Sequence, residues 1–257
     1  MRMSRRFVAT AAVLLLAGGS YGCASRTLAA PVVPAEEPTP VSTVIVSEGR
    51  PALESARLPG RGDGRLRIMP LGDSITYGLG DPDLGSYRDE LGRKLAAAGV
   101  EVDFVGSMRS GPAGTDRDNE GHIGWRIDQI AARADHWMAT YRPQVVLLHI
   151  GTNDMRTDEK ATGAAGRLSE LIDQLLADGP EVHVVVARIV GSDKADYQRR
   201  IDAYNAAIPD LVATKGGRVH LADQHAIEGD QLGDPVHPNK KGYRAMAGNW
   251  FDVLDPS

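Results

Sequence analysis

Apolar residues follow two alternating patterns along the chain from residue 66 onward. Short continuous apolar runs are typical of strands buried on both faces of a parallel sheet, whereas recurrence every three or four positions is typical of one helix face. The runs predict strands at 66–71, 102–105, 145–150, 182–190 and 219–222. The helical periodicity predicts helices that include residues 87–95, 127–141, 168–175, 201–212 and 240–253.

This alternation of strands and helices predicts the α/β fold class. Successive parallel strands joined by helices form one sheet, and the helices come to cover both of its faces. We therefore expect a three-layer α/β/α domain built on a five-stranded parallel sheet. Ligands of such sheets bind beyond the carboxyl ends of the strands.

Residues 1–23 have the features of an export signal. Basic residues precede an apolar stretch at 7–17 that is too short to cross a bilayer as a mature helix. The Arg5-Arg6 pair also resembles a twin-arginine start, so the general secretory route and the twin-arginine route both stay open. Cys23 resembles the end of a lipobox, which would make it a lipidated membrane tether, and plain secretion is the alternative. Either way we expect an extracytoplasmic protein.

The segment after the signal has a different composition. Residues 24–64 contain repeated prolines and no sustained apolar period, which predicts a disordered linker. The remaining residues, 65–257, are numerous enough for one well-buried domain. Because Cys23 is the only cysteine, no internal disulfide is expected.

The charge balance excludes one class of partner. The formal net charge of −5 becomes −8 when the three arginines of residues 1–23 are removed. No cluster of Lys and Arg follows residue 24, whereas nucleic-acid binding depends on such clusters. We therefore expect no nucleic-acid partner.

Three short polar segments carry residue types that together can cleave an ester. Residues 72–76 (GDSIT) follow the first predicted strand and residues 151–154 (GTND) follow the third. Residues 234–237 (DPVH) lie in the loop after the fifth. Because carboxyl ends of parallel strands meet at one rim, we expect the three segments to lie together there.

Each segment offers one chemical role and one structural alternative. Ser74 offers a nucleophilic hydroxyl, or else helps to cap a helix. Asn153 offers an amide donor for an oxyanion, or else occupies a turn. Asp234, three residues before His237, can orient its imidazole as a base, or else caps the last helix.

The other candidate polar residues are interpreted as structural. The remaining histidines show no spacing typical of metal ligands, so no metal site is expected. Asp154 is interpreted as a local hydrogen-bond acceptor. The chemistry of Ser74, Asp234 and His237 needs no cofactor.

These segments resemble the conserved blocks of the SGNH hydrolases, also called GDSL esterases, over about residues 66–251. The resemblance implies the flavodoxin-like SGNH hydrolase fold, with Ser74, Asp234 and His237 as catalytic residues. It also implies an oxyanion hole formed by Ser74, Asn153 and a glycine. Gly106 and Gly124 compete for that last role, and we choose Gly124 because it directly precedes an amphipathic helix, whose N-terminus presents free N–H groups.

Further segments resemble carbohydrate esterase family three. They are residues 67–74, 85–88, 102–107 and 120–127, with Ile123 in place of a frequent small polar residue. This resemblance implies an acetylxylan esterase that removes acetyl groups from polysaccharide through an acetyl-enzyme intermediate. The alternatives are an esterase of lipids or other small esters with the same catalytic residues, and a non-catalytic polysaccharide-binding module.

Overall fold

The computed structural model describes residues 64–254 of the chain. The predicted export signal, Cys23 and nearly all of the predicted linker lie outside the described residues. That part of the domain organisation therefore stays a prediction.

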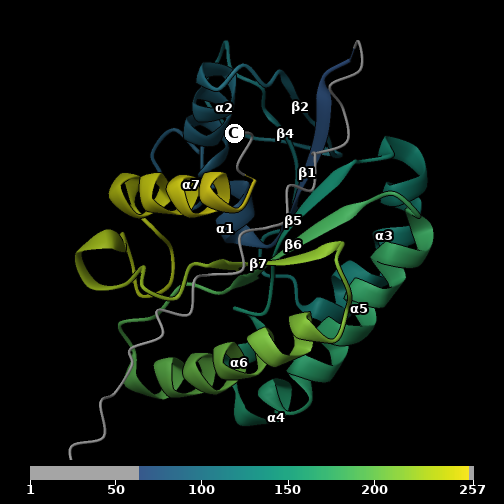
Figure 1. The fold of residues 1–257 in the computed structure, drawn as a ribbon. Helices are drawn as coiled ribbons and strands as arrows, with labels where there is room; N and C mark the ends of the chain where they lie inside the picture. The colour runs from purple at the N-terminus through teal and green to yellow at the C-terminus, as the bar shows by residue number, and fades with distance from the viewer. Residues whose placement is uncertain (1–63, 255–257) are drawn as a thin grey trace, which may run out of the picture. The chain divides into compact units, whose positions relative to one another are not determined.

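A parallel sheet forms the middle layer of the domain (Figure 1). Five parallel strands of this seven-stranded sheet lie in the order β2-β1-β5-β6-β7. Their bounds are β1 Leu66–Gly72, β2 Val102–Phe104, β5 Val145–His149, β6 His183–Arg188 and β7 Val219–Asp223. These are the five strands that the apolar runs predict, so the predicted fold class is confirmed.

Two short strands that the apolar pattern did not predict extend the sheet. They are β3 (Met108–Arg109) and β4 (Asp118–Gly121), which pair with each other in antiparallel fashion. β4 also pairs in parallel with the last two residues of β1, Leu71 and Gly72. β2 pairs with the first three residues of β1, 66–68. The sequence of β4, DNEG, has no apolar alternation, because side-chain hydrogen bonds rather than apolar packing hold its polar residues.

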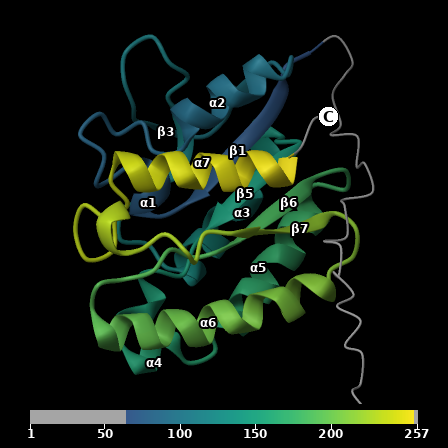
Figure 2. The ribbon, with the colours of Figure 1, turned by 60° about the vertical axis from the view of Figure 1, so that its left-hand side comes forward.

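Helices cover both faces of the sheet (Figures 1 and 2). Side chains alternate along β5, so that Val146 and Leu148 enter one core while Val145 and Leu147 enter the other. The first core is closed by α3 (Ile127–Tyr141), α5 (Ala164–Asp178) and α6 (Ala195–Ala213). The second is closed by α1 (Ser74–Tyr77), α2 (Arg88–Ala97) and α7 (Lys240–Leu254).

Three short helical segments complete the described chain: η1 (Asp154–Arg156), α4 (Asp158–Ala161) and η2 (Gly229–Gln231). Among the helices of residues 64–254, none is long and apolar enough to cross a membrane.

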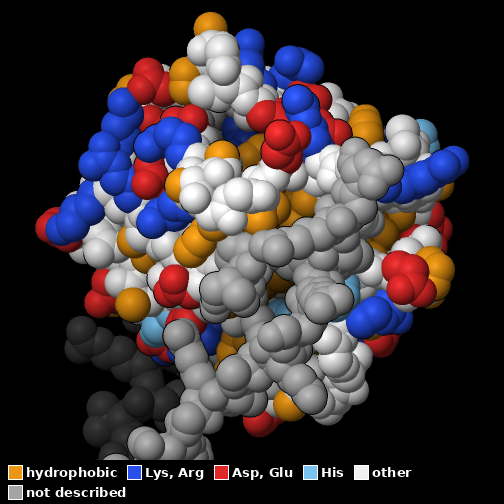
Figure 3. Space-filling view, turned by 45° about the horizontal axis from the view of Figure 1, so that its top comes forward, with side chains coloured by type: hydrophobic (Ala, Val, Ile, Leu, Met, Phe, Trp, Pro, Cys, Tyr) orange, Lys and Arg blue, Asp and Glu red, His pale blue; other side chains and the backbone are white. Residues whose placement is uncertain are grey.

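Opposite charges are mixed on the surface. On the face drawn in Figure 3, Lys and Arg side chains lie among Asp and Glu side chains. The ion pairs of the described residues include Arg93 with Glu90 at 2.7 Å and Arg109 with Asp118 at 2.8 Å. Each such exposed pair contributes at most about 1 kcal/mol, so these pairs matter more for charge distribution than for stability.

The carboxyl ends of three strands lie level with one another. Gly72, the last residue of β1, pairs with His149 of β5 on one side and with Gly121 of β4 on the other. A Cβ atom at Gly72 would lie 2.1 Å from the His149 carbonyl oxygen, so no side chain fits there. The chain that leaves β1 therefore emerges directly between the segments that follow β4 and β5.

His149 is a fully buried imidazole at the end of β5, and its Nε2 accepts a hydrogen bond from the Val190 N–H at 3.3 Å. Burial lowers the pKa of His149 to about 4. Between about pH 6.5 and pH 4 the unfolded chain binds a proton here that the folded chain does not, so this residue makes stability fall as pH falls. Asp73, whose pKa burial raises to about 6, acts in the opposite direction.

We predict that His149→Gln removes this dependence. The difference in unfolding free energy between wild type and variant should shrink by about 3 kcal/mol from pH 7 to pH 4. The reason is that the pKa of His149 is about 6.5 in the unfolded chain and about 4 in the folded chain, and each pH unit between these values changes the free energy by about 1.4 kcal/mol. Using the difference cancels the opposing effect of Asp73. Urea denaturation at several pH values measures it, with His136→Gln at the surface of α3 as the control for loss of an imidazole. A difference that is constant with pH would contradict the prediction.

Candidate active site

Ser74 is placed by the end of β1 and the start of α1. Asp73 is the N-cap of α1, and its Oδ1 accepts a hydrogen bond from the Ile75 N–H at 3.0 Å. The cap is therefore supplied by Asp73, which leaves the Ser74 hydroxyl for another partner. Within the described residues, no hydrogen bond is made by the Ser74 N–H, as expected at the first turn of a helix.

The structure brings Ser74, His237 and Asp234 together in one hydrogen-bonded series. Ser74 Oγ lies 2.9 Å from His237 Nε2, and His237 Nδ1 lies 2.7 Å from Asp234 Oδ2. A carboxylate only accepts, so Nδ1 carries the proton and Nε2 accepts the Ser74 O–H. This is the tautomer in which the imidazole can take the serine proton.

Asp234 is held ionised by its own turn. Its Oδ1 accepts hydrogen bonds from the Val236 N–H and the His237 N–H, both at 3.0 Å. Partial burial raises the pKa of Asp234, but these bonds and the His237 ring outweigh it and hold the pKa below its ordinary value. The same carboxyl group thus shapes the turn and orients the imidazole.

Contacts from other loops fix the position of the segment that contains His237. Gly80 has a φ of +90°, and a Cβ atom there would lie 2.4 Å from the Pro238 carbonyl oxygen. Ser192 Oγ donates to the Pro235 carbonyl at 2.8 Å. The imidazole therefore approaches Ser74 from a loop that is packed on two sides.

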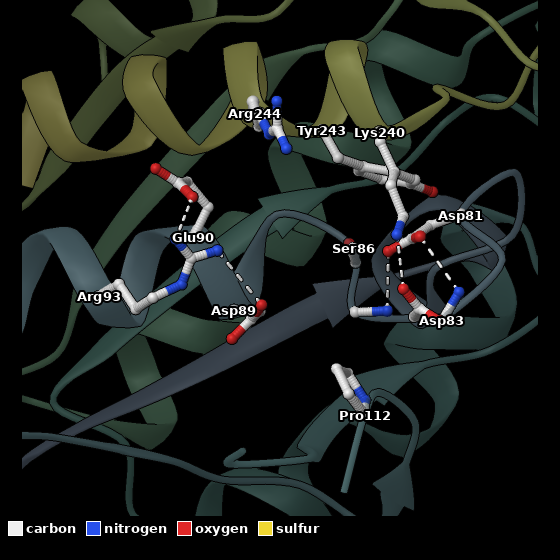
Figure 4. A pocket seen from close by; sticks show the side chains of 11 residues that line it. Asp81, Asp83, Ser86, Asp89, Glu90, Arg93, Pro112, Lys240, Tyr243 and Arg244 are labelled. Carbon is white, nitrogen blue, oxygen red and sulfur yellow. Dashed lines mark hydrogen bonds and ion pairs between the residues drawn. The ribbon is translucent and has the colours of Figure 1, made fainter. Parts of the chain in front are cut away.

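A polar pocket lies beside this segment and is lined by residues of α2, α7 and the 81–86 loop (Figure 4). Asp81 accepts hydrogen bonds from the N–H groups of Asp83 and Gly85 at 3.1 and 3.0 Å. Asp83 forms an ion pair with Lys240 at 2.6 Å, three residues beyond His237. Ser74, Asp234 and His237 do not line this pocket, and the ion pair of Asp83 with Lys240 joins the 81–86 loop to α7.

Asn153 lies at the same rim and faces the segment after β4. Its Nδ2 donates to the Trp125 carbonyl at 2.9 Å and approaches Asp73 Oδ2 at 3.4 Å. One amide N–H is thus firmly held, while the second makes only the long contact with Asp73.

The two candidate glycines lie at different levels of the sheet. The Val105 N–H, just before Gly106, bonds the Ile68 carbonyl at 2.9 Å, which places Gly106 beside the middle of β1. Gly124 instead lies beyond the end of β1, in a turn whose next residue, Trp125, contacts Asn153. This register favours Gly124 over Gly106 as the glycine of the site.

The residues interpreted as structural also have identifiable partners. Asp154 is fully buried and accepts hydrogen bonds from the Ile127 N–H at 3.1 Å and from Arg167 at 2.8 Å. Within residues 64–254, no group of three or more His, Cys, Asp or Glu side chains could hold a metal ion.

Sequence reasoning included Glu120 and His122 in the resembling segment 120–127 but assigned neither side chain a role in the site. Their side chains lie 2.6 Å apart, immediately before the turn that contains Gly124. Their spacing of two residues at the end of a polar strand, which puts both side chains on one face of an extended chain, was the signal that could have shown the pair.

Comparisons with known proteins point to one family. The GDSL-like Lipase/Acylhydrolase family matches residues 71–245. The chain is 28% identical to a multidomain esterase of Ruminococcus flavefaciens over 84% of its own length. It spans 31% and 56% of the lengths of two curated relatives that it matches.

Solved structures show the same similarity. The Clostridium thermocellum family 3 carbohydrate esterase is 40% identical, with a TM-score of 0.65 over 74% of this chain and 95% of that one. A carbohydrate esterase family 3 protein of Talaromyces cellulolyticus is 32% identical, with a TM-score of 0.63 over 72% and 94% of the two chains.

The fold and the residues at its rim thus define an acylhydrolase domain of the GDSL type. The chain belongs to the GDSL-like lipase/acylhydrolase family, and its similarity is to carbohydrate esterase family 3 within that class.

We predict that Asp234→Asn lowers kcat for 4-nitrophenyl acetate by about a hundredfold or more, because an amide no longer enforces the Nδ1–H tautomer or stabilises the imidazolium. The fold should persist, since an asparagine oxygen can still accept the N–H bonds of the turn. Steady-state kinetics and circular dichroism measure both effects. Asp230→Asn, at an exposed carboxylate of the same region, is the matched control and should stay within twofold of wild type. Wild-type kinetics in Asp234→Asn would assign the orienting role to another group.

Proposed function

We propose that this protein is a serine esterase that removes acetyl groups from carbohydrate. The observation that carries the proposal is the series Ser74 Oγ, His237 and Asp234, with separations of 2.9 and 2.7 Å. A nucleophile, a base and an orienting carboxylate in this order are the set that acyl transfer requires.

In the first half-reaction His237 Nε2 takes the proton of Ser74 as Oγ attacks the acetyl carbonyl. The tetrahedral intermediate collapses, the sugar oxygen leaves with the proton from His237, and an acetyl-enzyme remains on Ser74. In the second half-reaction His237 takes a proton from water, whose oxygen attacks the acetyl carbon. Collapse returns the proton to Ser74 Oγ and releases acetate.

Three donors are proposed to hold the oxyanion in both steps. They are the N–H of Ser74, the N–H of Gly124 and the side-chain amide of Asn153. The first two make no other hydrogen bond within the described residues. Asn153 contributes the N–H that has only the 3.4 Å contact with Asp73. Donors fixed before reaction stabilise developing charge most effectively, because they need not reorganise.

The substrate class is supported by the relatives and by the absence of a long apolar segment near the site. The similar structures are named as family 3 carbohydrate esterases, and another, 31% identical, as an acetyl esterase mutant with acetate ion. Within residues 64–254, Ile123 in the turn of Gly124 is the one large apolar side chain that is exposed. The alternative is an esterase of lipids or other small esters with the same residues.

We predict that Ser74→Ala abolishes turnover and leaves the fold intact, because it removes one hydroxyl whose role is chemical. A fluorophosphonate should attach to Ser74 of the wild type, located by mass spectrometry of the digested protein. Labelling at another residue, or near-full activity of the variant, would refute Ser74 as the nucleophile.

We predict that kcat/KM on aryl esters falls steeply from acetate through butyrate to octanoate. A methylene that fits a groove would add up to about 0.8 kcal/mol of binding, whereas one that clashes subtracts. Trp125, half-buried next to the turn of Gly124, is positioned to limit the acyl pocket. Acetylated xylo-oligosaccharide should be deacetylated and triglyceride should not. Rates that rise with chain length would favour the lipid alternative.

We also propose that the protein is exported, on the basis of its first 23 residues alone. If Cys23 is lipidated, the exported protein partitions into detergent, and Cys23→Ala moves it to the aqueous phase. Equal aqueous partitioning of both forms would support plain secretion, and retention of the full-length protein in the cytoplasm would refute export.

A further inference from the structure

Glu120 is a fully buried carboxylate in β4, close to the site. It accepts hydrogen bonds from the Ser107 N–H at 2.7 Å and from Ser107 Oγ at 2.6 Å. Its third partner is His122 Nε2 at 2.6 Å. Removing a carboxylate from water is costly unless it is fully hydrogen bonded, so this group needs both partners to be retained in the interior.

The His122 ring is fixed by stacking as well as by Glu120. It stacks on Trp125 with ring centroids 4.2 Å apart and on Trp137 of α3 with centroids 5.0 Å apart. The two tryptophan rings are themselves 6.3 Å apart, so the three rings form one cluster. A ring that is both stacked and hydrogen bonded at Nε2 has one available orientation.

His122 is also the first residue of the turn that presents Gly124. The Trp125 N–H donates to the His122 carbonyl at 3.1 Å, and Gly124 has a φ of +80°. A positive φ at the third position is the signature of a type II turn, which leaves the N–H of that residue unbonded. The direction of the Gly124 N–H is therefore set by how the ends of this turn are held.

Both ends of the turn are held by the groups just described. The His122 N–H bonds the Gly72 carbonyl at 2.9 Å, and the Trp125 carbonyl accepts the Asn153 amide at 2.9 Å. The side chains at the two ends are held as well: Glu120 is hydrogen bonded to His122, and the His122 ring stacks on Trp125.

We propose that Glu120 and His122 form a positioning pair that fixes the turn of Gly124 and so aims its N–H at the oxyanion. Among the partners of Glu120 and His122 in residues 64–254, neither Ser74 nor His237 appears, so the pair acts through the turn rather than on the substrate. This inference rests on the proposed function, because it assigns the oxyanion contact to Gly124.

The test compares His122→Phe, which keeps a stacking ring but loses Nε2, with His122→Gln, which keeps an N–H for Glu120 but loses the ring. His122→Phe should lower kcat for 4-nitrophenyl acetate by about tenfold or more with KM within twofold, since a misaligned donor weakens charge stabilisation in the transition state. The rate of inactivation by a fluorophosphonate should fall by a similar factor, because the phosphoryl oxygen uses the same donors. His122→Gln should lie closer to wild type.

Glu120→Gln is the second variant and should give the same separation of kcat from KM, so the test does not depend on one variant folding. The matched control is His220→Phe, at the opposite end of the strands. It removes another partly exposed histidine that is hydrogen bonded to and stacked on a neighbour, His183 at 3.0 Å, and should leave kcat within twofold. Thermal unfolding verifies that each variant is folded.

Folded His122→Phe or Glu120→Gln with kcat within twofold of wild type, or with a loss confined to KM, would overturn the inference. The assays use an aryl acetate, so they do not depend on the identity of the natural substrate. Turnover by Ser74→Ala would refute the proposed function, whereas an inactive Ser74→Ala beside fully active His122 and Glu120 variants would refute the positioning pair alone.

Discussion

The packing of Gly72 against β5 is the constraint on which the rest of the site depends. Its Cα lies so close to the His149 carbonyl that a side chain is excluded, and the ladder fixes Gly72 level with both His149 and Gly121. Three chain segments therefore leave the sheet at one height. The nucleophile, the amide of Asn153 and the turn of Gly124 take their relative positions from that register, because each begins within a few residues of a strand end.

Buried polar groups surround this strand end, and backbone carbonyl oxygens accept many of their hydrogen bonds. Arg88 is 1% exposed and donates to the carbonyl oxygens of Thr76, Leu84 and Ser110, and no carboxylate of residues 64–254 is bonded to it. Burial lowers the pKa of its guanidinium and raises that of the Asp73 carboxyl group. Such groups fix loop geometry, because displacing any of them would leave a desolvated polar atom without a partner.

The loop that contains Asp234 and His237 is organised differently from the rest of the site. Asp234 and His237 belong to a loop that is more exposed than the Ser74 turn, and the loop is held by contacts with Gly80 and Ser192. A base must exchange protons with substrate and water, so partial exposure suits His237. The turn of Gly124, which we propose as a source of an oxyanion donor, is held at its two ends by hydrogen bonds with the Gly72 carbonyl and the Asn153 amide.

The sequence by itself determined the five parallel strands, the helices between them and the identity of Ser74, Asn153, Asp234 and His237 as candidates. This was possible because burial on both sheet faces leaves continuous apolar runs, and because strand ends of a parallel sheet must meet. Only the tertiary structure decided how they meet. The 2.9 Å contact between Ser74 and His237 joins residues 163 positions apart, and no local pattern encodes such a distance. The polar strand β4 has no apolar period in the sequence, because hydrogen bonds rather than apolar packing hold its side chains. The contact between Glu120 and His122 was decided by the structure, although their spacing of two residues offered a signal for it.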